Sequence, residues 1–453
     1  MIFDYRKDWK RIGVSASLAF AMIAGCGVSA FAAGLKDASC GKRECACGET
    51  DAHKFAGNLR SYPFMNEEPP SGTPAPEGYV PFHMEHYSRH GSRWLIGEGD
   101  YTKPVEKLEA AERNGKLTSL GEKTLSALRE IEKDSKGRLG ELSDKGAIQH
   151  KGIGRRMALN FPEIFNDSAD IDAKSTVVIR CILSMLNGLE GIRSVAPGVS
   201  PKTDASYADM WFMNYDDKPG WAVKDKAMAT VLKEYQEKHK GDGSYLSRLV
   251  TDAEFAADSV APGLMPYLYM VLGNAQSHSG QPWLLEDVFS PEELKEQWMC
   301  GNAEWFIHGG NTDMTGGRMP FVQRNLLRRI ISRADEAISS GRHGANLRYG
   351  HDGILLSIVT LMELGGYGDI INDFDRLEEK GWHDYDIIPM GGNMQLVFYR
   401  KPGGDDCGDV LVKALVNEKE VTMPGEAVSG PYYRWKDLRD YYLQKLSAFD
   451  AAQ

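Results

Sequence analysis

The chain has 453 residues, of which 42% are hydrophobic and 26% are charged, and its formal net charge at pH 7 is −11. This composition is typical of a globular protein that buries a sizeable core in one or two domains. The excess of 64 acidic over 53 basic residues argues against a nucleic-acid-binding surface, so no nucleic-acid partner is expected. A local cluster of arginines in such a chain is more consistent with a site for a small anion.

Residues 1–32 are predicted to be an export signal peptide. Basic residues at positions 6, 7, 10 and 11 precede a small, apolar stretch over 14–28, which is shorter than the roughly 20 residues that span a bilayer. Two processing alternatives remain open: cleavage after Ala30-Phe31-Ala32, and lipidation of Cys26 in Ile23-Ala24-Gly25-Cys26. We expect an exported protein, periplasmic or secreted, with no membrane contact except a lipid anchor in the second case.

Six cysteines follow Cys26, at positions 40, 45, 47, 181, 300 and 407. An exported protein meets an oxidising compartment, so up to three disulfides are expected, in a pairing that the sequence does not define. Cys40, Cys45 and Cys47 lie close together, but only His53 follows as a fourth zinc ligand, and the spacing is not that of a zinc finger. We therefore expect no metal ion and no other cofactor.

Residues 33–78 are polar and rich in Gly and Pro, and they are predicted to form a surface lead-in. The sequence YVPFHMEHY alternates apolar and polar residues, which predicts a strand followed by a sharp turn at Gly91. Two helical patterns follow within 118–161, the second one starting near Ser143. The β-branched run TVVIRCI predicts another strand that ends near Arg180. Residues 79–187 are thus the expected first part of an α/β core.

Residues 188–318 have a mostly helical pattern with aromatic patches, and they are predicted to be an inserted cap domain. Residues 319–340 fit an amphipathic helix. LRYGHDGILLSIVTLMELGG then predicts a short strand, a turn at Gly350-His351-Asp352, and a buried helix closed by Gly365-Gly366. NMQLVFYRK and DVLVKALVN predict two further strands. Residues 319–453 are the expected second part of the core, and the alternation of strands and helices predicts an α/β sheet with a cap.

The chemistry is expected in the sequence HYSRHGSRW, where Arg89 and Arg93 flank His90. A metal site at His83, His86 and His90 is disfavoured, because alternation along a strand turns His83 away from the other two. A hydrogen-bonded core histidine between solvated arginines is the plainer alternative. A phosphate dianion explains the residue types better, because arginine forks bind it bidentately and a histidine nitrogen is a competent nucleophile.

Asp352 is the candidate proton donor to a leaving group. It lies at the start of the predicted helix ILLSIVTLMEL, whose free N–H groups favour a nearby anion. A carboxylic acid beside a phosphate dianion has its pKa raised enough to donate a proton. A simple helix N-cap is the alternative role, and it is compatible with catalysis. For Arg180, phosphate binding competes with a plain surface position.

Three motifs in order resemble those of the histidine acid phosphatases, the family that includes phytases: Arg89-His90-Gly91-x-Arg93, STVVIRCILSM and His351-Asp352. IIPMGGNMQLVFYR resembles a late segment of the family, and VLVKALVNEKEV resembles the C-terminal region of its multiple inositol-polyphosphate phosphatase members. The resemblance covers most of the chain from about Val80 onward. It implies a histidine phosphatase fold, with a central mixed β-sheet flanked by helices, an inserted mostly α-helical cap domain and no metal.

The same resemblance implies a role for each candidate residue. His90 is implied to be the nucleophile that becomes a phosphohistidine, and Asp352 the proton donor to the leaving group. The implied phosphate ligands are Arg89, Arg93 and Arg180, with His351 as a further contact.

Two departures from the family pattern bear on the substrate. Leu95, after Trp94, stands where the family usually has proline, and His351-Asp352-Gly353 stands where the inositol-polyphosphate members carry His-Ala-Glu. The leading expectation is an exported, metal-independent phosphomonoesterase acting on inositol polyphosphates such as phytate. The alternatives are a general acid phosphatase for sugar phosphates or other small monoesters, and a phosphate-ligand-binding protein that kept the fold.

Overall fold

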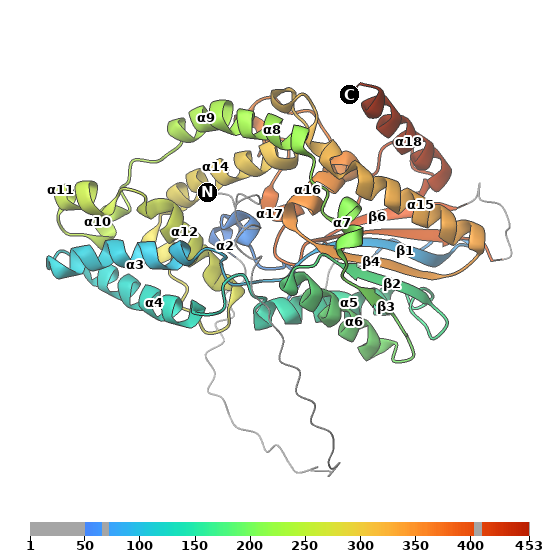
Figure 1. The fold of residues 1–453 in the computed structure, drawn as a ribbon, viewed down its shortest axis with the longest axis horizontal. Coiled ribbons are helices and arrows are strands. Elements are labelled where there is room, and N and C mark those ends of the chain that lie inside the picture. Colours follow the sequence, from blue (N-terminus) through green and yellow to red (C-terminus); the bar gives the residue numbers. More distant parts are fainter. Residues whose placement is uncertain (1–49, 66–71, 403–409, 453) are drawn as a thin grey trace, which may run out of the picture. The chain divides into compact units, whose positions relative to one another are not determined.

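The computed structural model of the protein describes residues 50–65, 72–402 and 410–452. They belong to one compact unit, drawn as a ribbon in Figure 1. The predicted export signal, including Cys26, lies outside the described residues. Within the described part, no helix is long and apolar enough to cross a membrane.

An eight-stranded sheet forms the core, in the order β3-β2-β4-β1-β5-β6-β7, with β8 paired to β6. β3, β2, β4 and β1 run parallel, whereas β5 is antiparallel to β1 and β6 is antiparallel to β5. The predicted central mixed sheet is therefore confirmed. The strands are β1 (Val80–Arg89), β2 (Asp170–Ser175), β3 (Lys202–Asp204), β4 (Gly344–Gly350), β5 (Asn393–Arg400), β6 (Leu411–Val416), β7 (Lys419–Val421) and β8 (Tyr433–Arg434).

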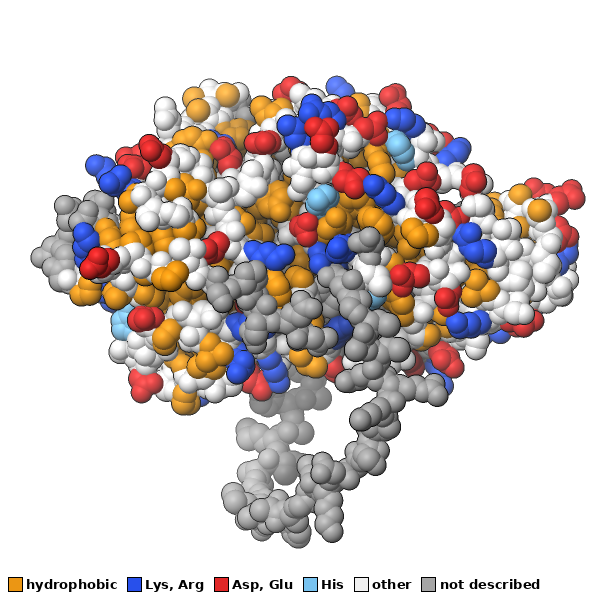
Figure 2. All heavy atoms as spheres, turned by 180° about the vertical axis from the view of Figure 1, so that it is seen from behind, with side chains coloured by type: hydrophobic (Ala, Val, Ile, Leu, Met, Phe, Trp, Pro, Cys, Tyr) orange, Lys and Arg blue, Asp and Glu red, His pale blue; other side chains and the backbone are white. Residues whose placement is uncertain are grey.

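Helices cover both faces of this sheet (Figure 1). α5 (Asp144–Asn160) and α6 (Ile179–Val195) pack on one face, where their apolar side chains join those of β2, β4 and β5 in one core. α15 (Arg324–Ser340), α16 (Asp352–Leu361) and α18 (Trp435–Ala451) lie on the other face. The amphipathic helix and the buried helix expected from the sequence are thus confirmed. On the face of the molecule seen in Figure 2, acidic and basic side chains are interspersed.

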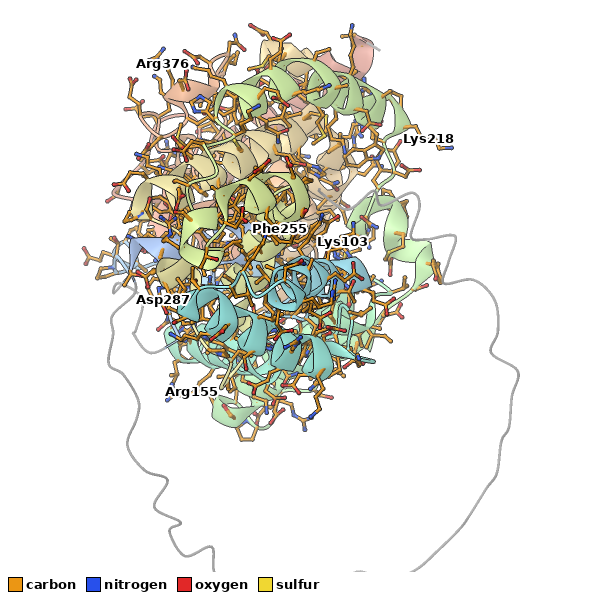
Figure 3. All side chains as sticks on the ribbon, turned by 90° about the vertical axis from the view of Figure 1, so that its left-hand side faces the viewer. Lys103, Arg155, Lys218, Phe255, Asp287 and Arg376 are labelled. Atoms are coloured by element: carbon orange, nitrogen blue, oxygen red, sulfur yellow. The ribbon has the colours of Figure 1, made fainter. Side chains whose placement is uncertain are left out.

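A helical lobe stands beside the sheet, and Figure 3 looks onto it, with Lys103 and Phe255 near the middle of that view. Its apolar core joins α3 (Glu98–Arg113) and α4 (Ser119–Ser135) to helices from the second half of the chain. The other helical segments that follow β2, some in the lobe and some beside the sheet, are η2 (Tyr207–Asp209), α7 (Met210–Met213), α8 (Lys218–Ala227), η3 (Met228–Leu232), α9 (Lys233–Lys238), α10 (Leu246–Leu249), α11 (Ala253–Phe255), η4 (Ala256–Val260), α12 (Leu264–Asn274), η5 (Ala275–Ser277), α13 (Leu285–Val288), α14 (Pro291–Gly309), η6 (Asp313–Thr315), η7 (Met319–Gln323), η8 (Leu364–Gly366), η9 (Phe374–Arg376) and α17 (Asp384–Ile387).

The described residues form one compact unit, and two features of it cross the expected limits of the segments 79–187 and 188–318. Position 188 falls inside α6, and β3 extends the core sheet by pairing with β2. Conversely, α3 and α4 from the first expected segment share the core of the helical lobe. A sequence pattern shows that a helix has an apolar side, but not which core that side joins.

The strand predicted from TVVIRCI is wrong. β2 ends at Ser175, and α6 begins at Ile179. Cys181, Met185, Leu189 and Ile192 are buried along one side of α6, at helical spacing. That packing outweighs the preference of β-branched residues for strands. Arg180 therefore lies in the first turn of a helix.

Residues 50–65 are not the surface lead-in that was predicted. They form α2 (Asp51–Lys54) and η1 (Gly57–Leu59), and Ala56, Leu59 and Tyr62 are buried. These apolar side chains are too widely spaced to produce a clear pattern, yet each finds a place in one of the two cores. Asn58 in this segment contacts Arg89 at the end of β1.

Cys181 and Cys300 are free and buried. Two of the six cysteines are therefore unpaired, so the three disulfides that were the expected maximum cannot all form. The other cysteines, including the group Cys40, Cys45 and Cys47, lie outside the described residues.

Candidate active site

Three parallel strands end at one edge of the sheet, and the predicted site residues follow them. Arg89 at the end of β1 pairs with Gly350 at the end of β4, and Ser175 at the end of β2 pairs with Tyr349. The carboxyl edge of a parallel sheet is where α/β proteins bind ligands. His90, His351 and the start of α6 all lie immediately after these ends.

His90 is buried, with 1% of its surface exposed. Its Nδ1 lies 2.9 Å from the carbonyl oxygen of Gly91. A carbonyl only accepts, so Nδ1 carries the proton, and Nε2 keeps its lone pair. Burial, and then the charges of Arg180, Arg89 and Arg93, hold the pKa of His90 well below its usual value. The ring is therefore neutral, as a nucleophile must be.

Arg89 is fully buried, which contradicts the alternative of a solvated arginine at this position. Its Nη1 donates to the carbonyl oxygens of Asn58 at 2.5 Å and Ile388 at 2.6 Å. Its Nη2 lies 2.9 Å from Oδ2 of Asp352. The guanidinium of Arg89 is thus held by the backbone at Asn58 and Ile388 and by the carboxylate of Asp352.

Arg93 and Arg180 are both half-buried. Nη1 of Arg93 donates to the carbonyl oxygen of Trp94 at 3.0 Å, and Nη1 of Arg180 donates to that of Gly140 at 3.4 Å. Burial, followed by the charges of Arg180 and Arg89, lowers the pKa of Arg93 to about 10. Three guanidinium groups therefore repel one another beside His90, and an anion bound among them would relieve that repulsion.

His351 faces His90 edge-on, with 5.9 Å between the ring centres. Its Nε2 lies 3.2 Å from Oγ1 of Thr176, and its backbone N–H donates to the hydroxyl of Tyr87 at 3.2 Å. Burial, and then the charge of Arg180, lowers the pKa of His351 to about 3. A second neutral imidazole therefore lines the site. The structure thus brings all six predicted site residues together, although their roles stay predictions.

Asp352 is the first residue of α16, and the N-cap position belongs to His351. The alternative of a helix N-cap for Asp352 is therefore wrong by one residue. Burial alone would raise the pKa of Asp352, but the charges of Arg89, His351 and Arg93 outweigh it and hold that pKa at about 2. Without a ligand the carboxylate is ionised, so donating a proton requires the added negative charge of a bound dianion.

Gln149 on α5 is a supporting residue that the sequence did not reveal. Its Oε1 accepts from the backbone N–H of Ser92 at 2.8 Å, and its Nε2 donates to Oγ of Ser92 and of Ser61, both at 3.0 Å. Gly91 packs so closely against Gly146 that a Cβ on Gly91 would lie 2.5 Å from the Gly146 carbonyl oxygen. Close packing, rather than the sharp turn inferred earlier, explains this glycine.

His308 on α14 also comes close to the candidate acid. Its Nε2 would lie 2.5 Å from a Cβ built on Gly353, the residue after Asp352. Burial, and then the charge of Lys224, lowers the pKa of His308 to about 3, while Asp352 acts in the opposite direction. In the sequence, His308 stood among aromatic residues of EWFIHGGN, and nothing in that pattern linked it to a site some 40 residues later.

Arg180→Ala should weaken competitive inhibition by inorganic phosphate by roughly tenfold to a hundredfold, the scale of a hydrogen bond to a charged group. The loss is expected because Arg180 acts electrostatically on His90. The inhibition constant of phosphate is the measurement. Arg193→Ala, an exposed change on the same helix, is the control and should leave that constant unchanged. An unaltered constant for Arg180→Ala would mean that Arg180 does not touch the anion.

Buried neutral histidines should make the folded protein sensitive to acid. Burial is the first cause of the lowered pKa of His86 and His351, each about 3, and of His150, about 4. The unfolded chain binds these protons below about pH 6.5, so the free energy of unfolding should fall as pH drops from there towards 4. The thermal unfolding midpoint against pH is the measurement.

His86→Leu is the matched test of that slope. Both ring nitrogens of His86 are buried without a hydrogen-bond partner in the described part of the chain. The variant should unfold at similar or higher temperature and lose less stability between pH 6.5 and pH 4 than the wild type. A wild type equally stable at both pH values would contradict the assignment of these histidines as neutral.

Comparisons with known proteins bear on the fold. No protein-family model matches the chain, and no curated protein matches it in sequence. A solved structure of the Bifidobacterium longum multiple inositol polyphosphate phosphatase in complex with phosphate is similar, with a TM-score of 0.69, at 18% identity over 86% of this chain and 97% of that one. Its complex with inositol hexasulfate gives a TM-score of 0.68 with the same identity and coverage.

The phytase from D. castellii is also similar, with a TM-score of 0.62, at 16% identity over 87% of this chain and 85% of that one. Identities this low establish the fold and leave the activity to be argued from the site. The chain therefore has the fold of these inositol polyphosphate phosphatases and phytases, a mixed α/β sheet with a helical lobe, as its resemblance to the histidine acid phosphatases implied.

Proposed function

We propose that the protein is a phosphomonoesterase that needs no metal and works through a phosphohistidine at His90. The observation that carries this proposal is the 2.9 Å contact between Nδ1 of His90 and the carbonyl oxygen of Gly91. From it we infer that Nδ1 carries the proton and that Nε2 is unprotonated among three arginines, whose charges, after burial, lower the pKa of His90. A protein that only binds phosphate needs the arginines but has no use for a nucleophile in this state.

In the first step, Nε2 of His90 bonds to phosphorus while the bond from phosphorus to the leaving oxygen breaks. That oxygen takes a proton from Asp352. In the second step, a water oxygen bonds to phosphorus and gives a proton to the Asp352 carboxylate, while the N–P bond breaks and inorganic phosphate leaves. Asp352 is protonated again at the end of each cycle, as general acid–base catalysis requires.

Inositol polyphosphates are the proposed substrate class. Support comes from the shared fold and from the similar Bifidobacterium longum structure that holds inositol hexasulfate, a sulfate analogue of such a compound. Other small phosphomonoesters are the alternative substrates. They are included because this chain has His351-Asp352-Gly353 where the inositol-polyphosphate phosphatases that it resembles carry His-Ala-Glu.

Turnover of p-nitrophenyl phosphate in the presence of EDTA is the first test of the proposed function. We expect release of nitrophenol at acidic pH, unaffected by the chelator. Binding of phosphate without turnover would support a phosphate-binding protein instead. A panel of phytate, sugar phosphates and nucleotides then assigns the substrate, and faster turnover of a simple sugar phosphate would favour the general acid phosphatase.

We also propose export, from the basic and apolar pattern of residues 1–32. Mass spectrometry of protein recovered from the expressing cell tests it. A mature chain beginning after Ala32 fits simple cleavage, and a lipidated Cys26 fits the lipoprotein alternative. An intact N-terminus on cytoplasmic protein would contradict export.

A further inference from the structure

The two carbonyl groups that hold Arg89 are both tied to one buried acid, Asp384. Nη1 of Arg89 donates to the carbonyl oxygens of Asn58 and Ile388, which lie far apart in the chain. The backbone N–H of Asn58 donates to the carboxylate of Asp384. The backbone N–H of Ile388 donates to the carbonyl oxygen of Asp384 at 2.8 Å. Asp384 therefore contacts both residues on which the guanidinium rests.

Asp384 is itself firmly held. It is the first residue of α17, and 1% of its surface is exposed. Its Oδ1 accepts from Nε1 of Trp298 on α14 and from the backbone N–H of Tyr385, both at 2.9 Å. Its own N–H donates to Oδ1 of Asn302, also on α14, at 2.8 Å. A chain of direct contacts thus runs from α14 through Asp384 to the backbone that holds Arg89.

The side chain of Asp384 meets hydrogen-bond donors at both of its oxygens. Oδ1 already has two donors, and Oδ2 lies beside Gly57, where a Cβ would approach it to 2.9 Å. Asn58 is the next residue, so Oδ2 is the acceptor for its N–H. An ionised carboxylate accepts at both oxygens, whereas an amide accepts at one end and donates at the other. Among isosteric side chains, the position therefore suits a carboxylate alone.

Hydrogen bonds, more than a neighbouring cation, oppose the cost of burying this carboxylate. Burial raises the pKa of Asp384 to about 6, and hydrogen bonds from Trp298, Tyr385 and Asn58 act against that rise, each more strongly than the charge of His383. Because the pKa lies above its usual value, ionisation of Asp384 lowers the free energy of unfolding as pH rises through 6. A neutral isostere would avoid that cost near pH 7, so stability alone does not explain the acid.

We propose that Asp384 is a positioning residue for phosphate binding, which holds the carbonyl groups of Asn58 and Ile388 where they aim the guanidinium of Arg89 at the anion beside His90. This rests on the proposed function in taking Arg89 as a phosphate ligand. Asp384 acts through Arg89 and does not itself touch the anion. A guanidinium binds an oxyanion in the plane of its fork, so a small shift of either carbonyl group tilts that plane and weakens binding.

Asp384→Asn is the test, because the amide keeps the shape of the side chain but turns an N–H towards a donor. The inhibition constant of inorganic phosphate should rise about tenfold. The unfolding midpoint at pH 7 should be similar to that of the wild type, because the buried charge is gone. A loss of affinity without a loss of stability is not expected from a merely structural residue. Asp386→Asn, which changes a partly exposed carboxylate of the same helix that pairs with Arg60, is the control and should alter neither quantity.

The same change in an Arg89→Ala background shows whether the effect passes through Arg89. There Asp384→Asn should cause no further rise in the inhibition constant, since the group that it positions is absent. A further tenfold rise in that background would overturn the positioning role. So would an unchanged constant in Asp384→Asn alone, or an Asp384→Asn protein that does not fold.

Failure of this proposal and failure of the proposed function are distinguishable. Turnover of p-nitrophenyl phosphate with equal phosphate inhibition in Asp384→Asn and wild type would overturn the positioning role and leave the phosphatase standing. If the wild type releases no nitrophenol, the phosphatase is overturned. The measurement is then the rise in unfolding midpoint caused by inorganic phosphate, which should be smaller in Asp384→Asn. Equal rises, or no rise in the wild type, would overturn the positioning role as well.

Discussion

Replacing His90 with alanine should reduce phosphomonoester turnover to the uncatalysed background. The expected loss in kcat is on the order of 10⁶-fold, the scale seen when a protease loses its nucleophile. The reason is chemical, because Nε2 of His90 is the atom proposed to bond to phosphorus, and the neighbouring imidazole of His351 lies with its Nε2 against Thr176. Release of nitrophenol from p-nitrophenyl phosphate is the measurement.

A matched control and a binding assay separate chemistry from folding. His343→Ala changes a histidine at the opposite end of β4, which contacts Asn166, and should keep full activity. His90→Ala should still gain thermal stability from inorganic phosphate, because the three arginines remain. A His90→Ala protein that retains more than a few per cent of wild-type turnover would remove His90 from the proposed role.

Asp352→Asn should lower kcat for alkyl phosphates by roughly 10²–10⁴-fold, the usual worth of general acid catalysis. It should affect p-nitrophenyl phosphate far less, because nitrophenolate leaves without a proton. Comparing kcat for a sugar phosphate and for p-nitrophenyl phosphate in the two proteins is the measurement. Equal losses on both would mean that Asp352 holds Arg89 in place and does not donate the proton.

The pH dependence of kcat is a second test of Asp352 as the proton donor. In the unliganded protein, Arg89 is the main charge that offsets burial and holds the pKa of Asp352 at about 2. A phosphate dianion competes for the same positive charge, so the pKa in the substrate complex must be higher. The acid works only when protonated, so kcat for an alkyl phosphate should fall as pH rises through that value. The fall should disappear in Asp352→Asn.

Much of the fold could be predicted because the informative signals are local. The alternation in YVPFHMEHY and the buried run after His351 each fit one kind of element, and β1 and α16 confirm them. The strand predicted from TVVIRCI was wrong because burial of one side of α6 against the core outweighs the local preference of its β-branched residues for a strand. The packing of α3 and α4 was hidden for a related reason: both lie early in the chain but pack with helices formed much later.

Part of the candidate site could likewise be predicted from the sequence, and part could not. His90, its flanking arginines and Asp352 could be singled out because each lies in a short motif. The residues that hold them in place could not, since Asn58, Gln149 and Ile388 reach the site from distant segments through backbone carbonyls or one amide. Contacts of that kind leave no local pattern. The sequence also gave no sign that Arg89 would be paired with Asp352 before any substrate arrives.

The covalent intermediate is the most direct test of the proposed mechanism. The protein would be mixed with ³²P-labelled substrate and quenched within one turnover, and the label on the protein measured after acid and after alkali. Label at His90 that survives alkali and is lost in acid, and that is absent from His90→Ala, is the predicted result. Rapid turnover with no label on the protein, or label that persists in His90→Ala, would contradict the phosphohistidine mechanism.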